Sequence, residues 1–343
     1  MPTQVSILFP VYNAVDTVEA AVQSILDQSY PNWELHWIDD GSTDGSTNLG
    51  HRLSQQDPRI HFYPRQHQGL VSALQQVILH AGIRMQQVRS DLSDQYFARM
   101  DADDFCYTDR FSEQVAFLEA HPACDLVSCQ VDFGGDRNRQ SGYAAHVDWV
   151  NGLLSPGDHF LNRFVDSPVP HPSVMFRAAS LAKYGGYQQG DFPEDYELWL
   201  RWLDAGAEFH KLPRKLMTWN DPPTRLSRND SRYAQEAFYE LKCRYLVKVL
   251  PANRPIWLWG AGRLTRRRFK LLEALGFPFA GFIDVDPGKI DQVIDGRRVQ
   301  SPETLPSNAF FILGVSNPGA RDKIETRLKT DGLQAGRDYL SCA

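Results

Sequence analysis

Short apolar runs alternate with segments of helical periodicity through the first part of the chain. An apolar run with the length of a buried strand lies at residues 5–9, further strands are predicted at residues 33–38, 96–100 and 126–133, and residues 60–62 alternate between apolar and polar. Between the first two runs, over residues 15–26, apolar residues recur at the spacing of a helix face. Strands that alternate with helices form a mainly parallel sheet with helices on its faces. The pattern therefore predicts an α/β fold for this region.

A second α/β pattern follows a helical stretch over residues 233–250 and a proline-flanked segment at residues 251–255. Its predicted elements are strands at residues 256–259, 280–283 and 310–313 and helices at residues 264–275 and from Arg321 onward. A chain of 343 residues has the length of about two domains, each with its own core. We predict a first domain over residues 1–228, a helical linker over residues 229–252 and a smaller α/β domain over residues 253–343.

Polar side chains follow the predicted strands of the first domain at the point where each strand ends. Asn13, Asp40, Arg65 and the acidic residues at 101–104 all occupy such positions. In open α/β sheets, ligands bind outside the carboxyl ends of the strands. One edge of the first sheet should therefore gather carboxylates and an arginine, a combination that suits a metal ion and a phosphorylated ligand.

The acidic run Asp101-Ala102-Asp103-Asp104 places three carboxylates within four residues. Such carboxylates repel one another unless a cation or hydrogen bonds hold them, and hard oxygen ligands suit Mg2+ or Mn2+. By itself the run could equally be a solvated loop or a helix cap, because Asp is common in both. The other strand-end motifs favour the metal site.

Five stretches in order give the first domain a resemblance to the family 2 glycosyltransferases, which have the GT-A fold. They are residues 5–13 (VSILFPVYN), residues 38–44 (IDDGSTD), Asp101 to Asp103, residues 171–177 (HPSVMFR) and residues 194–199 (EDYELW), and they span about the first 225 residues. The resemblance implies a mainly parallel mixed sheet and the transfer of a sugar from a nucleotide-sugar, with UDP-sugar as the expected donor. It also implies Mn2+ or Mg2+ as cofactor and a glycan or lipid-linked acceptor in bacterial surface-glycan assembly.

The resemblance also implies roles for individual residues. The nucleotide-sugar is expected to bind at Pro10, Tyr12, Asn13, Asp40, Arg65 and Asp101. Within that set, Asp40 would accept a hydrogen bond from the base and Arg65 would contact the base or the diphosphate. Asp103 matches the metal ligand, and Asp195 matches the catalytic base. One base and no covalent intermediate imply single displacement with inversion at the anomeric carbon.

Two of these positions have a structural alternative. Asp195 opens a predicted helix with an apolar stripe that includes Trp199 and Trp202, and acidic residues are favourable in a first helical turn. The ordered set of motifs favours the catalytic role. His171 could contact a phosphate or the acceptor, or it could be a structural histidine beside Pro172.

The second domain carries an incomplete dinucleotide-binding pattern. Gly260 and Gly262 follow a strand, Thr265 stands where a third glycine is expected, and Asp284 ends the next strand. The segment resembles Rossmann-like domains appended to some bacterial glycosyltransferases. An NAD(P)-linked oxidoreductase or a nucleotide-sensing protein is therefore an alternative function. A sugar-phosphate nucleotidyltransferase is disfavoured, since no glycine-rich loop follows the first strand.

Composition narrows the partners and the location. Lys and Arg total 36 against 42 Asp and Glu, so the net charge of −6 argues against nucleic acid as a partner. No window approaches the roughly 18 apolar residues of a membrane span, and no signal peptide is evident. Five cysteines without zinc-type spacing indicate reduced thiols. We expect a cytoplasmic protein, with peripheral contact to the inner membrane face if the acceptor is lipid-linked. The oligomeric state is left open.

Overall fold

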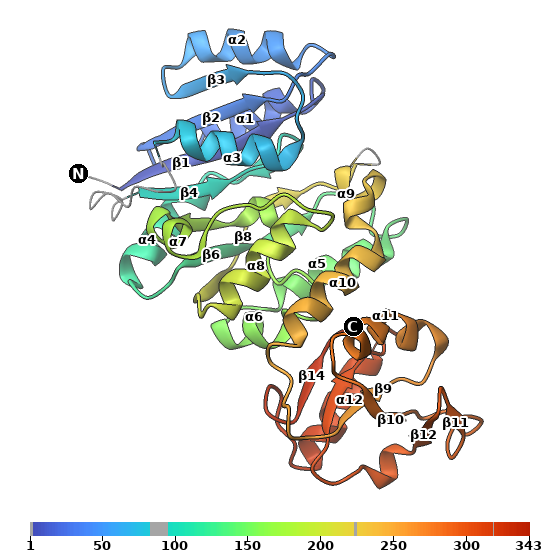
Figure 1. Ribbon diagram of the computed structural model, residues 1–343. Coiled ribbons are helices and arrows are strands. Elements are labelled where there is room, and N and C mark those ends of the chain that lie inside the picture. Colours follow the sequence, from blue (N-terminus) through green and yellow to red (C-terminus); the bar gives the residue numbers. More distant parts are fainter. Residues whose placement is uncertain (1–2, 83–94, 223–224, 318) are drawn as a thin grey trace. The chain divides into compact units, whose positions relative to one another are not determined.

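The computed structural model describes residues 3–82, 95–222, 225–317 and 319–343 (Figure 1). The chain packs into two compact units. The first comprises residues 1–159, 169–190 and 197–229, and the second comprises residues 160–168, 191–196 and 230–343. Each unit contains its own sheet. The domain limits at residues 228 and 252 stay a prediction from the sequence pattern.

The first unit is built on an eight-stranded sheet with the strand order β3-β2-β1-β4-β7-β6-β8-β5. The strands are β1 (Gln4–Val11), β2 (Trp33–Asp39), β3 (Ile60–Pro64), β4 (Gln95–Arg99), β5 (Phe105–Cys106), β6 (Leu126–Phe133), β7 (Met175–Arg177) and β8 (Phe209–Trp219). β3, β2, β1 and β4 are parallel neighbours, and β7 runs antiparallel to both β4 and β6. The predicted α/β fold with a mixed sheet is confirmed here.

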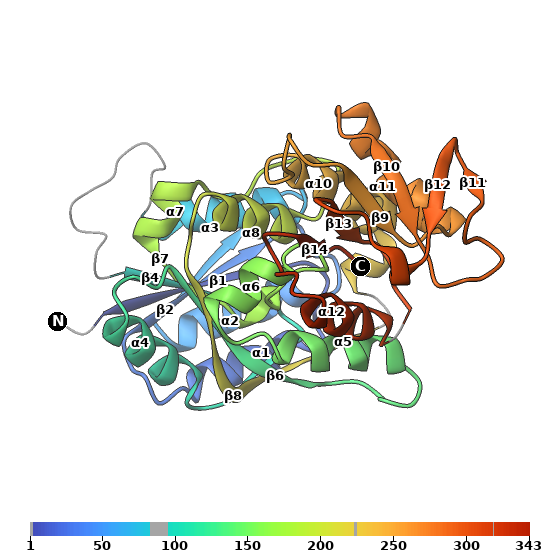
Figure 2. The same cartoon turned by 90° about the horizontal axis from the view of Figure 1, so that it is seen from below.

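Helices cover both faces of this sheet, which explains the continuous apolar run of β1. Ile7 and Phe9 face a core shared with α1, α2, α4 and α5, whereas Leu8 faces a core shared with α3, α7 and α8 (Figure 2). The helices are α1 (Val18–Leu26), α2 (Ser46–Gln56), α3 (Leu70–His80), α4 (Arg110–Ala120), α5 (Ser141–Asn151), α6 (Pro156–Asn162), α7 (Ala178–Tyr184), α8 (Glu194–Asp204) and α9 (Leu226–Asn229). A strand buried on both faces has no need of polar alternation.

The register of the parallel strands brings their carboxyl ends to one edge. Val11 pairs with Asp39, Asp39 pairs with Pro64, and Leu8 pairs with Arg99. The polar segments that follow these four strands therefore start side by side, as the sequence predicts.

Strand β8 is the main element that the hydrophobic pattern does not predict. It contains Pro213 between Lys211 and Lys215, and three consecutive residues in its middle are exposed. Its pairing with β6 shifts register on both sides of Gln130, which accommodates this irregular stretch. Tertiary pairing with β6 thus imposes the strand on a sequence with weak strand character.

The second unit holds a six-stranded, mainly parallel sheet with the order β11-β12-β10-β9-β13-β14. Its strands are β9 (Ile256–Trp259), β10 (Phe279–Ile283), β11 (Val293–Ile294), β12 (Arg297–Gln300), β13 (Phe310–Leu313) and β14 (Tyr339–Ser341), and its helices are α10 (Gln235–Leu246), α11 (Arg263–Ala274) and α12 (Ala320–Thr330). β9 and β13 have the predicted limits. Trp259, Phe311 and Leu328 belong to its core.

Two expectations from composition can be compared with the structure. Among the described residues, no helix has both the length and the apolar character that a membrane crossing requires. All five cysteines are buried free thiols, consistent with the expected reduced state.

The contact between Gly50 of α2 and Phe62 of β3 generates a stability prediction. A Cβ at Gly50 would lie 2.1 Å from a ring carbon of Phe62, whereas a Cβ at Gly142 of α5 would meet nothing within 4 Å. We expect Gly50→Ala to lower the free energy of unfolding by about 1–2 kcal/mol, because overpacking outweighs the roughly 1 kcal/mol gain in helix propensity. Gly142→Ala should be neutral or stabilising. Urea unfolding of both variants tests this, and equal stability of Gly50→Ala and wild type would contradict it.

Candidate active site

The loop after β1 is bound to the loop after β2. Asn13 adopts a left-handed conformation, with φ of 50°, which Asn tolerates better than most residues. Its backbone N–H donates to Ser42 Oγ at 2.9 Å, and its Oδ1 accepts from the Thr43 N–H at 2.8 Å. Pro10 is buried within β1, and the Tyr12 side chain that follows is 50% exposed. The structure thus places Tyr12 and Asn13 at the predicted edge.

Asp40 organises the segment after β3. Its side chain is only 4% exposed, and Oδ1 accepts from Arg65 Nε at 2.7 Å and from the Gln68 N–H at 3.1 Å. Oδ2 accepts from the Gly69 N–H at 2.8 Å and lies 2.9 Å from His67 Nδ1. A carboxylate has about four lone-pair sites, so these partners engage it fully. For Asp40 to accept a hydrogen bond from a base, one of these bonds must open; that role stays a prediction.

The segment after β3 also approaches the β2 loop closely. A Cβ at Gly41 would lie 2.7 Å from the His67 backbone nitrogen, and Gly41 has a φ of +80°. Only glycine combines that conformation with that approach. The His67 ring then stacks on Tyr12 with centroids 4.3 Å apart. This half-exposed aromatic pair offers a stacking surface at the edge of the sheet.

The three aspartates after β4 come together as the sequence predicts. Oxygens of Asp101, Asp103 and Asp104 lie within 4.8 Å of one another. Asp101 Oδ1 accepts from Nη2 of the buried Arg99 at 2.5 Å. Asp104 is 3% exposed; its Oδ1 accepts from the Asn220 N–H at 2.8 Å, and its Oδ2 has no partner among the described residues.

Electrostatics at this aspartate cluster favour a cation. Burial, followed by the negative charge of Asp101, raises the pKa of Asp103 to about 6. Burial and the charges of Asp101 and Asp103 raise the pKa of Asp104 well above its ordinary value. A buried carboxylate with an unpartnered oxygen is costly unless it binds a proton or a cation. The set of hard oxygen donors fits Mg2+ or Mn2+.

A segment after β8 contributes residues that the sequence analysis did not identify. Asn220 Nδ2 donates to the Asp103 carbonyl at 2.6 Å, in addition to its backbone bond to Asp104. Gly134 makes room for it, because a Cβ there would lie 1.9 Å from Asn220 Oδ1. Arg225 follows in the same segment and acts electrostatically on the aspartates. The turn-rich composition of residues 220–224, of which residues 223–224 lie outside the described ranges, was the only signal.

His171 is a buried residue that packs against the rings of Tyr187 and Trp199. It is 8% exposed, and its Nε2 is 2.7 Å from the hydroxyl of Tyr187. Burial and then the positive charge of Arg99 hold the pKa of His171 well below its ordinary value. These contacts favour the structural alternative, a buried neutral histidine.

Asp195 belongs to the second compact unit, where it stands in the first turn of α8. Its Oδ1 accepts from the Tyr196 N–H at 2.7 Å. The neighbours on both sides are anchored: Glu194 accepts from the Tyr233 hydroxyl at 2.6 Å, and the Tyr196 hydroxyl donates to the Arg163 carbonyl at 2.6 Å. The start of this helix is therefore fixed. Further along α8, the tryptophans at positions 199 and 202 are completely buried, as expected for core residues.

In the second unit, Asp284 is hydrogen-bonded to the glycine-containing turn that follows β9 and to residues of its own loop. Asp284 Oδ2 accepts from the Ala261 N–H at 2.9 Å and from Lys289 Nζ at 3.1 Å. Asp284 Oδ1 accepts from the Asp286 N–H at 3.0 Å. An acid that binds the ribose of a dinucleotide needs free lone pairs, so these contacts weigh against that role.

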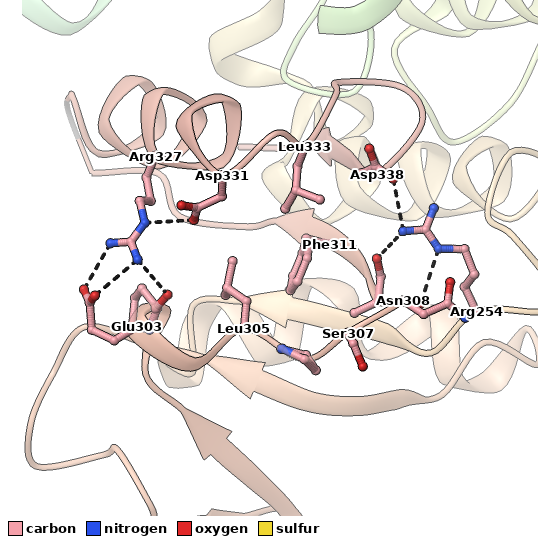
Figure 3. Close-up of a pocket in the computed structure, with 13 residues that line it drawn as sticks. Arg254, Glu303, Leu305, Ser307, Asn308, Phe311, Arg327, Asp331, Leu333 and Asp338 are labelled. Atoms are coloured by element: carbon pink, nitrogen blue, oxygen red, sulfur yellow. Dashed lines mark hydrogen bonds and ion pairs between the residues drawn. The ribbon is translucent and has the colours of Figure 1, made fainter.

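A cavity of about 530 Å³ in the second unit is separate from the predicted site residues (Figure 3). Figure 3 shows Phe311 in the middle of the lining residues, with Arg327 at one end and Arg254 at the other. Arg327 pairs with Glu303, and Arg254 pairs with Asp338 at 3.2 Å. Each of these two arginines is paired with a carboxylate, so neither offers an uncompensated positive charge to a ligand in the cavity.

Comparison with known families agrees with the geometry. The glycosyl transferase family 2 model matches residues 6–184, more than half of the 343-residue chain. EpsE of Bacillus subtilis, which bears a glycosyltransferase name, is 26% identical over 236 residues, covering 67% of this chain and 78% of EpsE. The amylovoran biosynthesis glycosyltransferase AmsE of Erwinia amylovora is 32% identical over 124 residues, covering 35% of this chain and 42% of AmsE.

Solved structures share the fold. TarS 1–349 of S. aureus, determined in complex with UDP-GlcNAc, has a TM-score of 0.53 at 15% identity, covering 73% of this chain and 67% of that chain. The mannosyltransferase PcManGT of Pyrobaculum calidifontis, determined with GDP-Man and Mn2+, has a TM-score of 0.52 at 18% identity, covering 80% of this chain and 70% of that chain. At these identities the likeness is one of fold.

The raised pKa of Asp103 predicts a pH-dependent response to Mn2+. Because the pKa is about 6 in the folded state and about 3.8 in the unfolded state, protonation of Asp103 stabilises the metal-free protein at low pH, and this contribution is lost as the pH rises through about 6. A divalent cation needs the deprotonated carboxylate. Saturating Mn2+ should therefore raise the melting temperature by about 5 °C at about pH 7.5 and by much less at about pH 5.

Asp103→Asn is the matched control for this measurement. The variant should melt higher than the metal-free wild type at about pH 7.5, because one buried charge is gone, and it should lose the Mn2+ response. An equal Mn2+ shift at both pH values, or a full shift in Asp103→Asn, would contradict the assignment.

Proposed function

The chain belongs to glycosyl transferase family 2, and from that premise we propose that this glycosyltransferase moves a sugar from a nucleotide-sugar, with UDP-sugar as the expected donor, to an acceptor hydroxyl. The observation that carries the proposal is the aspartate cluster after β4. It unites Asp101, Asp103 and a buried oxygen of Asp104, for which the described residues supply no hydrogen-bond partner, at the carboxyl edge of the sheet. Such a cluster suits a divalent cation and a diphosphate together.

In the proposed site, Asp103 would hold Mn2+ or Mg2+, with Asp101 and Asp104 beside it. When bound, the cation would neutralise negative charge on the departing diphosphate. The protein supplies the orientation: Arg99 fixes Asp101, and Asn220 fixes the backbone of Asp103 and the side chain of Asp104. The Mn2+ bound to PcManGT is a precedent within the same fold.

The nucleoside is proposed to bind where the loops after β1, β2 and β3 meet. Tyr12 offers an exposed ring for stacking on the base, and Asn13 holds its loop against the β2 loop. Arg65 lies beside Asp40, so a base that displaces one internal partner of Asp40 would meet both side chains. Pro10 supports this loop from within β1.

Asp195 is proposed as the catalytic base. Its carboxylate would take the proton of the acceptor hydroxyl while that oxygen forms a bond to the anomeric carbon and the bond to the diphosphate oxygen breaks. A positioned base contributes about 10²–10⁴-fold to such a reaction. The anchored neighbours Glu194 and Tyr196 hold the carboxylate in place.

The acceptor class completes the proposal. AmsE is named for the biosynthesis of the polysaccharide amylovoran, and we propose a glycan or lipid-linked acceptor in bacterial surface-glycan assembly. The enzyme would then work in the cytoplasm and meet a lipid-linked acceptor at the inner membrane face. No observation favours the NAD(P)-linked alternative, because Asp284 is engaged within its own unit.

Replacement of the base should separate chemistry from binding. We expect Asp195→Asn to reduce transfer by at least about 100-fold while donor affinity stays near that of wild type, because the amide cannot accept the proton. The assay is release of the nucleoside diphosphate in the presence of acceptor, with calorimetry for donor binding. Asp204→Asn, at the exposed end of the same helix, is the control. Undiminished turnover in Asp195→Asn would refute the role.

Product stereochemistry tests the single displacement. With one base and no covalent sugar–enzyme intermediate, the anomeric configuration of the donor should be inverted in the product. Proton NMR of the newly formed linkage reads the configuration directly. A retained configuration would rule out the mechanism in which Asp195 acts alone.

A further inference from the structure

Arg225 is enclosed by two aromatic rings and a buried carboxylate. Its guanidinium carbon lies 4.7 Å from the centroid of a Trp219 ring and 4.9 Å from the Tyr143 ring, distances at which cation–π attraction operates. Nη1 donates to the Tyr143 hydroxyl and lies 3.8 Å from Asp221 Oδ1. The side chain is 21% exposed, so it is largely but not completely enclosed.

The groups that enclose Arg225 are themselves fixed. Tyr143 packs against Phe133 with ring centroids 5.7 Å apart and against Trp219 at 5.3 Å. The Asp221 side chain is 1% exposed and accepts from Gln140 Nε2 at 2.7 Å. A guanidinium in such surroundings has lost most of its rotamer freedom in advance, so a ligand that binds it meets a preorganised group.

The charge of Arg225 acts on the aspartate cluster. Burial and Asp101 raise the pKa of Asp103, and the positive charge of Arg225 opposes that rise. The same charge acts on Asp104. Arg225 also contacts Trp219 and Asp221, the two residues that flank Asn220, and Asn220 is itself bonded to Asp103 and Asp104. Arg225 therefore stands at the edge of the site that is proposed to hold the diphosphate.

Part of the hydrogen-bonding capacity of Arg225 is unused. A guanidinium has five N–H donors in a planar fork. Nη1 is engaged with Tyr143, whereas neither Nε nor Nη2 donates to any residue within the described ranges. A planar pair of N–H donors matches two oxygens of a phosphate.

We infer that Arg225 is a diphosphate-binding residue of the donor site, with Nε and Nη2 as the donors to phosphate oxygens. The inference rests on the proposed function, because the diphosphate belongs to the nucleotide-sugar. It assigns the leaving group two positive partners: the cation held by the aspartates and a guanidinium preset by Tyr143 and Trp219. The opposing reading is that Arg225 serves only as an internal counter-ion to the aspartates.

Nucleotide binding separates these two readings. Calorimetry in the presence of Mn2+ would measure binding of four nucleotides separately, UDP, UMP, GDP and GMP, to the full chain and to Arg225→Gln. Each diphosphate is then compared with its own monophosphate. If Arg225 contacts the diphosphate, Arg225→Gln should lower the affinity for whichever nucleoside diphosphate the protein binds by about 10- to 100-fold. The affinity for the corresponding monophosphate should fall by clearly less. Arg225→Lys should recover only part of the loss, because an ammonium lacks the planar fork.

Arg214→Gln is the matched control, since Arg214 is an exposed arginine on β8 that pairs with Glu113. It should bind all nucleotides as wild type does. Thermal melting with and without Mn2+ checks that Arg225→Gln is folded and retains its metal site.

The outcomes are distinguishable. Wild-type affinity for the diphosphate in a folded Arg225→Gln would overturn the inference, as would equal weakening of diphosphate and monophosphate or full recovery in Arg225→Lys. If the wild-type chain binds neither UDP nor GDP in Mn2+, the proposed function itself fails.

Discussion

Three carboxylates after β4 lie within 4.8 Å of one another, and the proposed site depends on how the repulsion between their charges is offset. Burial raises the pKa of Asp103 and of Asp104, and one oxygen of Asp104 has no partner among the described residues. Folding nonetheless brings the cluster together, because Arg99 donates to Asp101 and Asn220 connects the loop to the end of β8. Because of this electrostatic cost, we expect the site to favour binding of a divalent ion.

The two units show how similar strand-end positions lead to different chemistry. Asp284 follows β10 as Asp40 follows β2, and both are buried carboxylates that close a neighbouring turn. The carboxylates of Asp40 and Asp284 accept hydrogen bonds from backbone N–H groups and from a nearby Arg or Lys. Both residues therefore stabilise loops in this structure. Asp104 differs because one of its two oxygens has no hydrogen-bond partner in the part of the chain that the structure describes. A ligand site is therefore marked by incomplete internal pairing more than by acidity at a strand end.

Much of the fold is readable from the sequence because its signals are local. The apolar runs of β1, β2, β6, β9 and β13 are buried on both faces, and the acidic run after β4 is contiguous. The missing parts depend on long-range pairing. Asn220 reaches Asp104 across 116 positions, and β8 takes its conformation from β6 despite Pro213. No sequence window contains both partners, so neither Asn220 nor Arg225 could be assigned in advance. Likewise, the complete engagement of Asp40 depends on a turn 25 to 29 residues further on.

The most direct test of the central claim is a calorimetric panel of nucleotides on the full chain. UDP, GDP, CDP, dTDP and NAD would each be titrated with and without Mn2+. We predict that one nucleoside diphosphate binds, that binding requires the metal, and that NAD gives no heat, since the aspartate cluster would hold a cation that neutralises the diphosphate. Binding of NAD alone, or nucleoside diphosphate binding indifferent to Mn2+, would contradict the account and move the function away from the aspartate cluster.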